Sequence, residues 1–275
     1  MPELPEVEMV RQVLEPQLCG RRLVGWILNR PEVIAQPGPE IFTQRVAGRC
    51  VNELGRRGKY LLVRLDSGDT LMVHLRMTGR LLVVPSACPE EKHTHIVFRL
   101  DGGEDLRFID TRRFGRLWLI PAGGEDEVDG IVRLGPEPFD ASFDTAYLRA
   151  KCGSSRRSIK TCLLDQRVVA GIGNIYADEI LFAAGIAPSR PAADLSETAW
   201  QRLAQAVPAV LSAAIVKNRM TPEQYLAGGG REYRSDRSLQ VYGREGAACP
   251  VCGAPITRQT LAGRSSYSCP RCQKL

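Results

Sequence analysis

This chain of 275 residues lacks the long apolar runs that mark membrane proteins. No apolar stretch approaches the roughly 20 residues of a membrane-spanning helix, and no basic region followed by an apolar run indicates a secretory signal. Internal repeats are absent as well. We therefore expect a soluble cytoplasmic protein of about two domains with no membrane partner.

Lysine is scarce, because only 6 of the 37 basic residues are lysine and 31 are arginine. Residues 1–150 carry 20 basic and 22 acidic side chains, whereas residues 151–275 carry 17 and 9, so the two halves have net charges of −2 and +8. A basic half is typical of a nucleic-acid-binding surface, since each neutralised phosphate releases counterions. Ordinary solvated surface charge, with arginine enriched by coding bias, is the alternative.

The cysteines do not form a disulfide framework, because five of the nine are scattered: Cys19, Cys50, Cys88, Cys152 and Cys162. The other four form two Cys-x2-Cys pairs, Cys249 with Cys252 and Cys269 with Cys272, which enclose sixteen residues. This spacing predicts a four-cysteine zinc site. Four protein ligands leave no position for a water molecule, so we expect one structural Zn²⁺. Two disulfides are the alternative, which a reducing compartment disfavours.

Apolar residues recur first at helical and then at strand spacing. Val7, Val10, Leu14 and Leu18 predict a helix that begins at Pro5. Short apolar runs separated by glycine turns predict antiparallel strands at Tyr60–Leu65, Leu71–Arg76, Leu81–Val84, His95–Leu100, Leu106–Ile109 and Leu117–Ile120. The first half is therefore expected to form a β-sandwich preceded by a helix.

The second half has helical signals, after a stretch at Pro121–Pro138 that is rich in Gly, Pro and acidic residues. Asp194-x-x-Glu197 predicts a capping box for a long helix towards Lys217, kinked at Pro208. Thr221-Pro222 predicts a further helix start. The predicted class is α+β, with a first part at 1–135, a helical part at 136–230 and a zinc-binding part at 231–275.

A glycine turn, Gly171-Ile172-Gly173, precedes an apolar helix. It lacks the third glycine of a dinucleotide fingerprint and the lysine of a P-loop, so we expect no nucleotide cofactor. Its backbone amides, together with Lys160 on the preceding helix, could hold a nucleic-acid backbone. A plain cap between packed helices is the alternative.

The first residues carry a potential nucleophile. Removal of Met1 would expose the nitrogen of Pro2, a secondary amine, and an α-amino group has an unperturbed pKa near ~8. Such an amine can attack a sugar carbon and hold it covalently, while the adjacent Glu3 moves protons. Alternatively, Pro5 and the nearby carboxylates simply begin a helix.

Six motifs together resemble the formamidopyrimidine-DNA glycosylases over essentially the whole chain. In order, they are residues 1–8 (MPELPEVE), Lys59, residues 74–79 (HLRMTG), residues 110–115 (DTRRFG), the 171–177 turn, and residues 241–244 (VYGR) with the four cysteines. The related endonuclease VIII branch usually has glycine in place of Leu4, which favours the branch that acts on oxidised purines.

The resemblance implies a bifunctional enzyme of base excision repair that excises formamidopyrimidines and 8-oxoguanine from double-stranded DNA. Pro2 would attack C1′ and form an imine, Glu3 would protonate the opening sugar, and β- and δ-elimination would then cut the strand. Glu6 would support the site. The resemblance further implies a monomer in the bacterial cytoplasm, acting on the nucleoid.

The resemblance also assigns DNA contacts. Met77, Arg112 and Phe114 would fill the space that the everted nucleotide leaves. Phosphates around the lesion would be held by Lys59, His74, Asn174 and Arg264, of which Lys59 and Arg264 are also assigned to catalysis, and Lys160 is a further candidate for DNA binding.

One departure from the family is the short segment 234–240, where a longer loop typically closes over flipped 8-oxoguanine. We expect formamidopyrimidines to be processed well and discrimination for 8-oxoguanine to be altered. A glycosylase with a preference for oxidised pyrimidines is one alternative function. A catalytically silent, zinc-containing protein that binds DNA damage is another, and a zinc nuclease is disfavoured because a four-cysteine site offers no metal-bound water.

Overall fold

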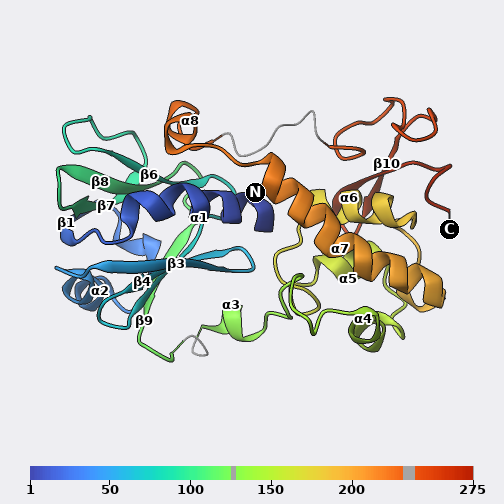
Figure 1. The fold of residues 1–275 in the computed structure, drawn as a ribbon, viewed down its shortest axis with the longest axis horizontal. Helices are drawn as coiled ribbons and strands as arrows, with labels where there is room; N and C mark the ends of the chain where they lie inside the picture. The colour runs from blue at the N-terminus through green and yellow to red at the C-terminus, as the bar shows by residue number, and fades with distance from the viewer. Residues whose placement is uncertain (125–127, 232–238, 275) are drawn as a thin grey trace. The chain divides into compact units, whose positions relative to one another are not determined.

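The computed structural model describes residues 1–124, 128–231 and 239–274 (Figure 1). By its internal contacts the chain divides into two compact units, Met1–Val132 with Asn218–Arg234, and Arg133–Lys217 with Ser235–Leu275. The short loop predicted at 234–240 falls largely on residues 232–238, which lie outside the described residues. Within the described ranges, no helix is both long and apolar enough to cross a membrane.

The first unit is a β-sandwich with a helix at its start. Its helices and strands are α1 (Leu4–Leu18), β1 (Leu23–Leu28), η1 (Pro31–Val33), β2 (Ile34–Gln36), α2 (Pro39–Val46), β3 (Val51–Arg57), β4 (Tyr60–Leu65), β5 (Thr70–His74), β6 (Gly79–Pro85), β7 (Thr94–Leu100), β8 (Glu104–Asp110), β9 (Arg116–Ile120), α3 (Asp129–Val132) and α8 (Pro222–Ala227).

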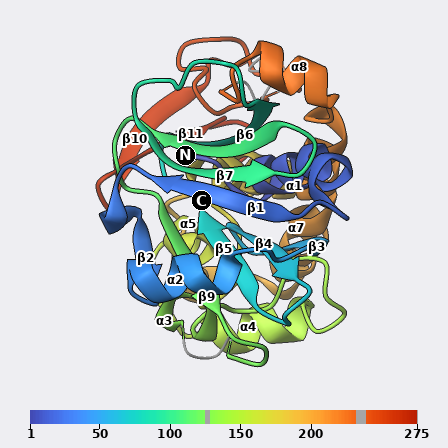
Figure 2. The same cartoon turned by 90° about the vertical axis from the view of Figure 1, so that its left-hand side faces the viewer.

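Two sheets form the sandwich, ordered β1-β7-β8-β6 and β2-β9-β5-β4-β3 (Figure 2). All pairs are antiparallel except β2 with β9, which run parallel. The six predicted strands are confirmed as β4 to β9, whereas β1, β2 and β3 were not predicted. The inner faces of both sheets supply the apolar core of this unit.

Helix α1 belongs to this core, because it contacts β3 and β4 of one sheet and β6 of the other. It begins at Leu4, one residue before the predicted start, with Pro5 in its first turn. Glu3 is the N-cap residue, and its backbone N–H donates to Oε2 of the fully buried Glu6 at 2.7 Å. The first turn of α1 thereby holds the backbone of Glu3, and with it the start of the chain, in place.

The second unit combines helices with a small hairpin. Its elements are α4 (Thr145–Cys152), α5 (Ile159–Leu164), α6 (Asn174–Ala184), η3 (Ala192–Asp194), α7 (Glu197–Lys217), β10 (Thr257–Leu261) and β11 (Arg264–Ser268). One apolar cluster contains residues of all four helices α4, α5, α6 and α7. A second, much smaller cluster surrounds the cysteines: Val241, Cys249, Ala254, Ile256 and Cys269.

The predicted long helix is confirmed as α7, but the predicted capping box is wrong. Asp194 lies in the short helix η3, and Ser196 caps α7 instead, with its Oγ accepting from the backbone N–H of Ala199 at 3.3 Å. Ser196 directly precedes the first helical residue, so its hydroxyl can accept from the backbone N–H of the third residue of the helix, as an N-cap does. The other predicted start is confirmed, because Thr221 and Gln224 form a capping box at α8.

Candidate active site and nucleic-acid interface

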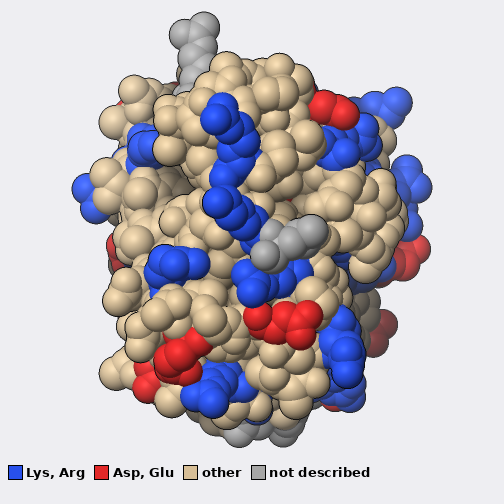
Figure 3. Space-filling view, turned by 90° about the vertical axis from the view of Figure 1, so that its right-hand side faces the viewer, with Lys and Arg blue, Asp and Glu red and all other residues tan. Residues whose placement is uncertain are grey.

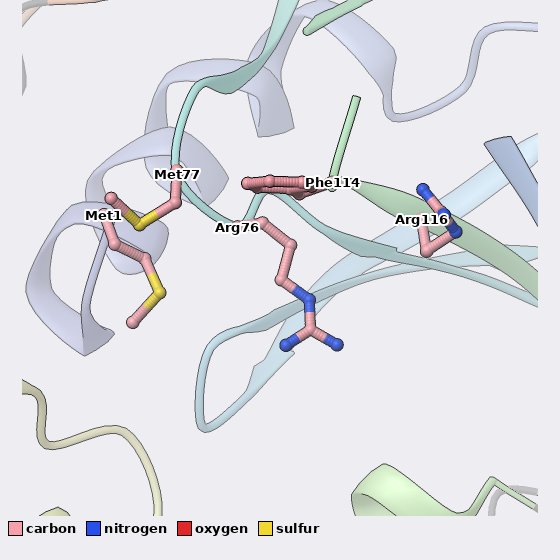
Figure 4. Close-up of a pocket in the computed structure, with 5 residues that line it drawn as sticks. All are labelled: Met1, Arg76, Met77, Phe114 and Arg116. Carbon is pink, nitrogen blue, oxygen red and sulfur yellow. The ribbon is translucent and has the colours of Figure 1, made fainter. Parts of the chain in front are cut away.

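The start of the chain borders a cavity of about 440 Å³ in the first unit. Its lining residues are Met1, Arg76, Met77, Phe114 and Arg116. Figure 4 shows Met1 and Met77 side by side, with the Phe114 ring next to them, the Arg76 side chain below the ring and Arg116 on its other side. Pro2 and Glu3, which follow Met1, are buried. The cavity therefore combines the chain start, two apolar side chains and two positive charges.

Two turns supply the apolar side chains of this cavity. Met77 lies between β5 and β6 and is 42% exposed, and Phe114 lies between β8 and β9 and is 51% exposed. The guanidinium carbon of Arg112 lies 4.9 Å from the centre of the Phe114 ring, within range of a cation–π interaction. Exposing Met and Phe to water is unfavourable unless a ligand covers them. The structure thus brings the three predicted space-filling residues together.

Lys59 and His74 lie on neighbouring strands of the same sheet. Lys59 follows Gly58 in the two-residue turn between β3 and β4, and His74 ends β5 opposite Tyr60, the first residue of β4. The ring of Tyr60 meets the ring of His74 edge-on at 4.7 Å. On its other side, His74 lies opposite Arg116 of β9 in the strand register, and Arg116 lines the cavity.

Burial, together with the positive charges of Arg76 and Lys59, lowers the pKa of His74 to about 3. The imidazole is therefore neutral at physiological pH. Its Nδ1 accepts from the backbone N–H of Arg76 at 3.0 Å. In a neutral ring the proton then resides on Nε2, so His74 presents an N–H donor of the kind that a phosphate oxygen accepts.

The remaining predicted DNA contacts belong to the second unit. Asn174 is the first residue of α6, and its Nδ2 donates to the carbonyl of Ser265 at 3.0 Å. Arg264 precedes Ser265, and its side chain is exposed beside the turn that joins β10 to β11. Asn174 and Arg264 are thus linked through the hairpin.

Lys160 differs from the other predicted DNA ligands. Its side chain is 1% exposed, and its Nζ lies 2.8 Å from Oδ1 of the fully buried Asp178 and 2.8 Å from the carbonyl of Ser265. Asp178 also accepts from the Ser266 hydroxyl and the Tyr267 N–H, each at 2.9 Å. This burial argues against the predicted DNA contact for Lys160, and the side chain instead fastens the hairpin to α5 and α6.

The four predicted zinc ligands meet at one point. Their sulfur atoms all lie within 4.8 Å of one another, with Cys249 and Cys272 at 3.9 Å and Cys252 and Cys269 at 3.5 Å. Four thiolates at ~2.3 Å from a tetrahedral zinc would be about 3.8 Å apart, so the donor set fits Zn²⁺. These separations are too long for the disulfide alternative, whose S–S bond is about 2.0 Å. The zinc finger therefore holds one structural Zn²⁺ through its four cysteines.

Sequence reasoning missed several residues that build these sites. Arg76 and Arg116 line the cavity, although both stand within or next to motifs that carried the resemblance. Glu179 accepts from the backbone N–H groups of Gln240, Val241 and Tyr242 at 2.8 to 2.9 Å, and so fixes the segment before the zinc finger. The pair Asp178-Glu179 within an apolar helix was the available signal, because buried carboxylates require partners.

Basic side chains are visible on the second unit too. On the face shown in Figure 3 a line of them runs from the top of the view down to its middle, with acidic side chains below and beside it. The surplus of positive charge expected from the sequence of this half is therefore exposed at least on this face.

Three family models match the chain in succession. The N-terminal domain model of formamidopyrimidine-DNA glycosylase matches residues 1–117, its H2TH domain model matches residues 134–224, and a zinc-finger model shared by this glycosylase and isoleucyl-tRNA synthetase matches residues 246–275. Together they span most of the chain.

Individual proteins are similar over the full length. The chain is 48% identical over 275 residues to a formamidopyrimidine-DNA glycosylase of Desulforamulus reducens, covering 100% of this chain and 99% of the relative. It is 51% identical over 258 residues to that of Moorella thermoacetica, covering 94% of each.

Solved structures agree. The Lactococcus lactis glycosylase bound to DNA containing a formamidopyrimidine has a TM-score of 0.90 and 33% identity, covering 99% of this chain and 100% of that one. A MutM complex with DNA containing carbocyclic 8-oxoguanine has a TM-score of 0.89 and 33% identity, covering all of both chains.

Proposed function

The chain belongs to the formamidopyrimidine-DNA glycosylase family, and from this premise we propose which of its residues carry out the family's two reactions. It is a bifunctional glycosylase and abasic-site lyase of base excision repair that excises oxidised purines, formamidopyrimidines and 8-oxoguanine. The observation that carries the residue assignments is the cavity that Met1 shares with Met77 and Phe114. In this proposal, nucleophile and space-filling residues stand at one place in the first unit.

Pro2 is the proposed nucleophile. Once Met1 is removed, the lone pair of its nitrogen forms a bond to C1′ of the damaged nucleotide, and the bond from C1′ to the base breaks with its electrons leaving on the base. The Pro2 nitrogen then gives up its own proton to the Glu3 carboxylate, and the freed lone pair opens the bond between C1′ and O4′ to give an iminium at C1′, while O4′ takes that proton from Glu3. Glu6 supports the site by accepting from the backbone N–H of Glu3.

Strand cleavage follows from the electron demand of the iminium. It acidifies C2′, whose proton passes to a base while the bond from C3′ to its phosphate oxygen breaks. Loss of a proton from C4′ then expels the phosphate at C5′, which completes β- and δ-elimination. Glu3 relays the protons in this scheme, and no nucleotide cofactor enters it.

Access to C1′ requires that the nucleotide leaves the base stack, which costs a few kcal/mol. We assign Met77 to the vacated space, Phe114 to the neighbouring base step and Arg112 to the orphaned base. The exposure of Met77 and Phe114 and the contact of Arg112 with the Phe114 ring support this assignment.

Phosphate contacts are assigned to Lys59, His74, Asn174 and Arg264, which position the damaged duplex without reading its sequence. Lys59 and Arg264 additionally take part in catalysis in this scheme. The neutral imidazole of His74 supports its role as a donor. Zn²⁺ supplies no chemistry to the reaction; its four cysteines hold the hairpin that carries Arg264.

We keep the three-part division at 1–135, 136–230 and 231–275 as a proposal. The partner is damaged double-stranded DNA, and we propose that the protein acts on it as a monomer in the bacterial cytoplasm. The relatives solved with DNA that contains an abasic site or a formamidopyrimidine support the choice of duplex.

Glu3→Gln tests the scheme. The variant should bind a duplex with 8-oxoguanine opposite cytosine within about threefold of wild type, and its single-turnover excision should fall by about a hundredfold or more, in the range of a lost general acid or base. Glu8→Gln is the matched control, because Glu8 lies in the helix that Glu3 caps but pairs with Arg11 and Arg56. Excision by Glu3→Gln at the control's rate would contradict the assignment.

A further inference from the structure

The two turns that carry Met77 and Phe114 are joined by a single carboxylate. Asp110 is the last residue of β8 and is fully buried. Its Oδ1 accepts from the hydroxyl of Thr78 and, at 3.2 Å, from the backbone N–H of Arg112. Its Oδ2 accepts from the backbone N–H of Gly115 at 2.7 Å.

The hydroxyl of Thr78 completes this connection. Besides donating to Asp110, its oxygen accepts from the backbone N–H of Arg112 at 3.1 Å. Thr78 directly follows Met77, and Arg112 and Gly115 enclose the segment that contains Phe114. This network around the buried Asp110 carboxylate therefore holds the turn of Phe114 at Arg112 and at Gly115, and the turn of Met77 at Thr78.

The backbone of Asp110 is held as firmly as its carboxylate. Its N–H donates to the carbonyl of His93 at 3.1 Å, and its carbonyl lies 2.7 Å from Nε2 of the buried His95. Gly115 packs closely against this strand, because a Cβ atom at this position would lie 2.5 Å from Cζ of Phe108. Asp110 is thus held in place, and it holds the turn that exposes Phe114.

The cost of burying the Asp110 carboxylate ties the two turns to each other. A buried carboxylate is strongly unfavourable without donors, and the donors here come from both turns. A turn that moves away therefore leaves both the carboxylate and a backbone N–H without a partner. The two turns consequently keep one mutual arrangement.

We propose that Asp110 is a positioning residue for base eversion, which holds Met77, Arg112 and Phe114 ready to enter the duplex. It acts through these residues and does not touch the reacting atoms. The inference rests on the proposed function, since it assumes their space-filling role. The requirement is specific: eversion of a damaged base needs the three side chains together, whereas an abasic site has no base to evert.

Asp110→Asn is the informative substitution, because it preserves size. An amide has only one acceptor oxygen, so it can satisfy either the Arg112 side or the Gly115 side, and its NH₂ group then faces a backbone N–H on the other. Asp105→Asn is the matched control. Asp105 is also buried in β8, but it bonds Ser86 and Arg107 at the opposite end of the strand.

The experiment compares two single-turnover rates for each protein, excision of 8-oxoguanine opposite cytosine and cleavage at a preformed abasic site. Asp110→Asn should reduce excision about tenfold or more, the effect of one lost hydrogen bond to a charged group, and abasic cleavage by less than about threefold. Asp105→Asn should leave the ratio of the two rates unchanged. Equal loss of both reactions in Asp110→Asn, or no loss of either, would overturn the proposal.

Thr78 gives an independent arm that keeps the carboxylate intact. Thr78→Val removes the hydroxyl at similar volume and should lower the ratio of excision to abasic cleavage, while Thr78→Ser, which retains the hydroxyl, should restore it. A valine variant with the ratio of the serine variant would contradict the network. Failure of the proposed function is distinct, because wild-type protein would then process neither substrate.

Discussion

His74 illustrates how burial fixes the chemical state of one side chain. Its ring is packed against Tyr60 and stands near Lys59 and Arg76, so both desolvation and charge disfavour the imidazolium. A neutral ring keeps the same donor and acceptor arrangement across the physiological range. Its tautomer is then set by the N–H of Arg76 alone.

This state has a consequence for stability. Above about pH 6.5 the ring is neutral in both folded and unfolded protein, and below it only the unfolded protein takes up the proton, because the folded pKa is about 3. The free energy of unfolding should therefore fall as the pH drops from 6.5 towards 3, by about 2 kcal/mol at pH 5 from this residue alone. Urea unfolding of wild type and His74→Gln at pH 7.5 and 5 measures it, and an equal decrease in both proteins would contradict the account.

Site residues that lie within a sequence motif could be predicted, whereas the contacts that a side chain makes with distant parts of the chain could not. The motif around Arg112 and Phe114 marked a functional turn, and the structure brings it next to Met77. Spacing alone could not show which way Lys160 points, because its acidic partner Asp178 lies eighteen positions away on another helix. The connections made by Asp110 were equally hidden, since they depend on two turns that only the folded sheet brings together.

The start of α7 shows what a single cap contributes to an element. Ser196 Oγ accepts from Ala199, and Asp194 lies outside the helix. Ser196→Ala should lower the free energy of unfolding by about 1 kcal/mol, as typical N-caps do. Asp194→Ala, the matched control, should change it by less than half of that. Thermal or urea unfolding checks both, and the reverse order would restore the capping box expected from the sequence.

Helix α6 fastens the zinc hairpin through its buried carboxylates. Burial raises the pKa of Asp178 to about 6 while Lys160 opposes that shift, so the carboxyl is ionised at neutral pH. Asp178→Asn should destabilise the protein by about 3 to 5 kcal/mol, because it leaves the Lys160 ammonium buried without its counterion.

A double-mutant cycle with Lys160→Met checks this pair. The two substitutions together should cost clearly less than the sum of the single ones, as measured by urea unfolding, since neither charge is then left alone. Additive losses would show that Lys160 and Asp178 act independently.

The elements themselves were unevenly predictable. Strand β4 was predicted with its correct ends because a run that is apolar except for Arg64 lies between two turns. Strand β3 escaped detection because it is largely polar, with only Val51 and Leu54 buried. The parallel pairing of β2 with β9 depends on residues about eighty positions apart, and local periodicity contains no information about such a contact.

Zinc stabilises the part of the chain around the cysteines, whose core is much smaller than the other two apolar clusters of the described residues. The apolar cluster around the cysteines is too small to fold a module alone, so the metal should supply that stability. Treatment with a strong chelator should release one zinc per chain and reduce DNA binding and excision together, with both restored by added Zn²⁺. Full excision by protein shown to be free of zinc would contradict a structural role for the metal.

The central claim for the chain as a whole is that Pro2, freed of Met1, forms a covalent imine with damaged DNA. Borohydride trapping on duplexes that contain 8-oxoguanine opposite cytosine, or an abasic site, tests it most directly when the adduct is mapped by mass spectrometry. The account predicts an adduct on both duplexes, located at Pro2, and none with protein that retains Met1. An adduct on neither duplex, or one located at another residue, would contradict it.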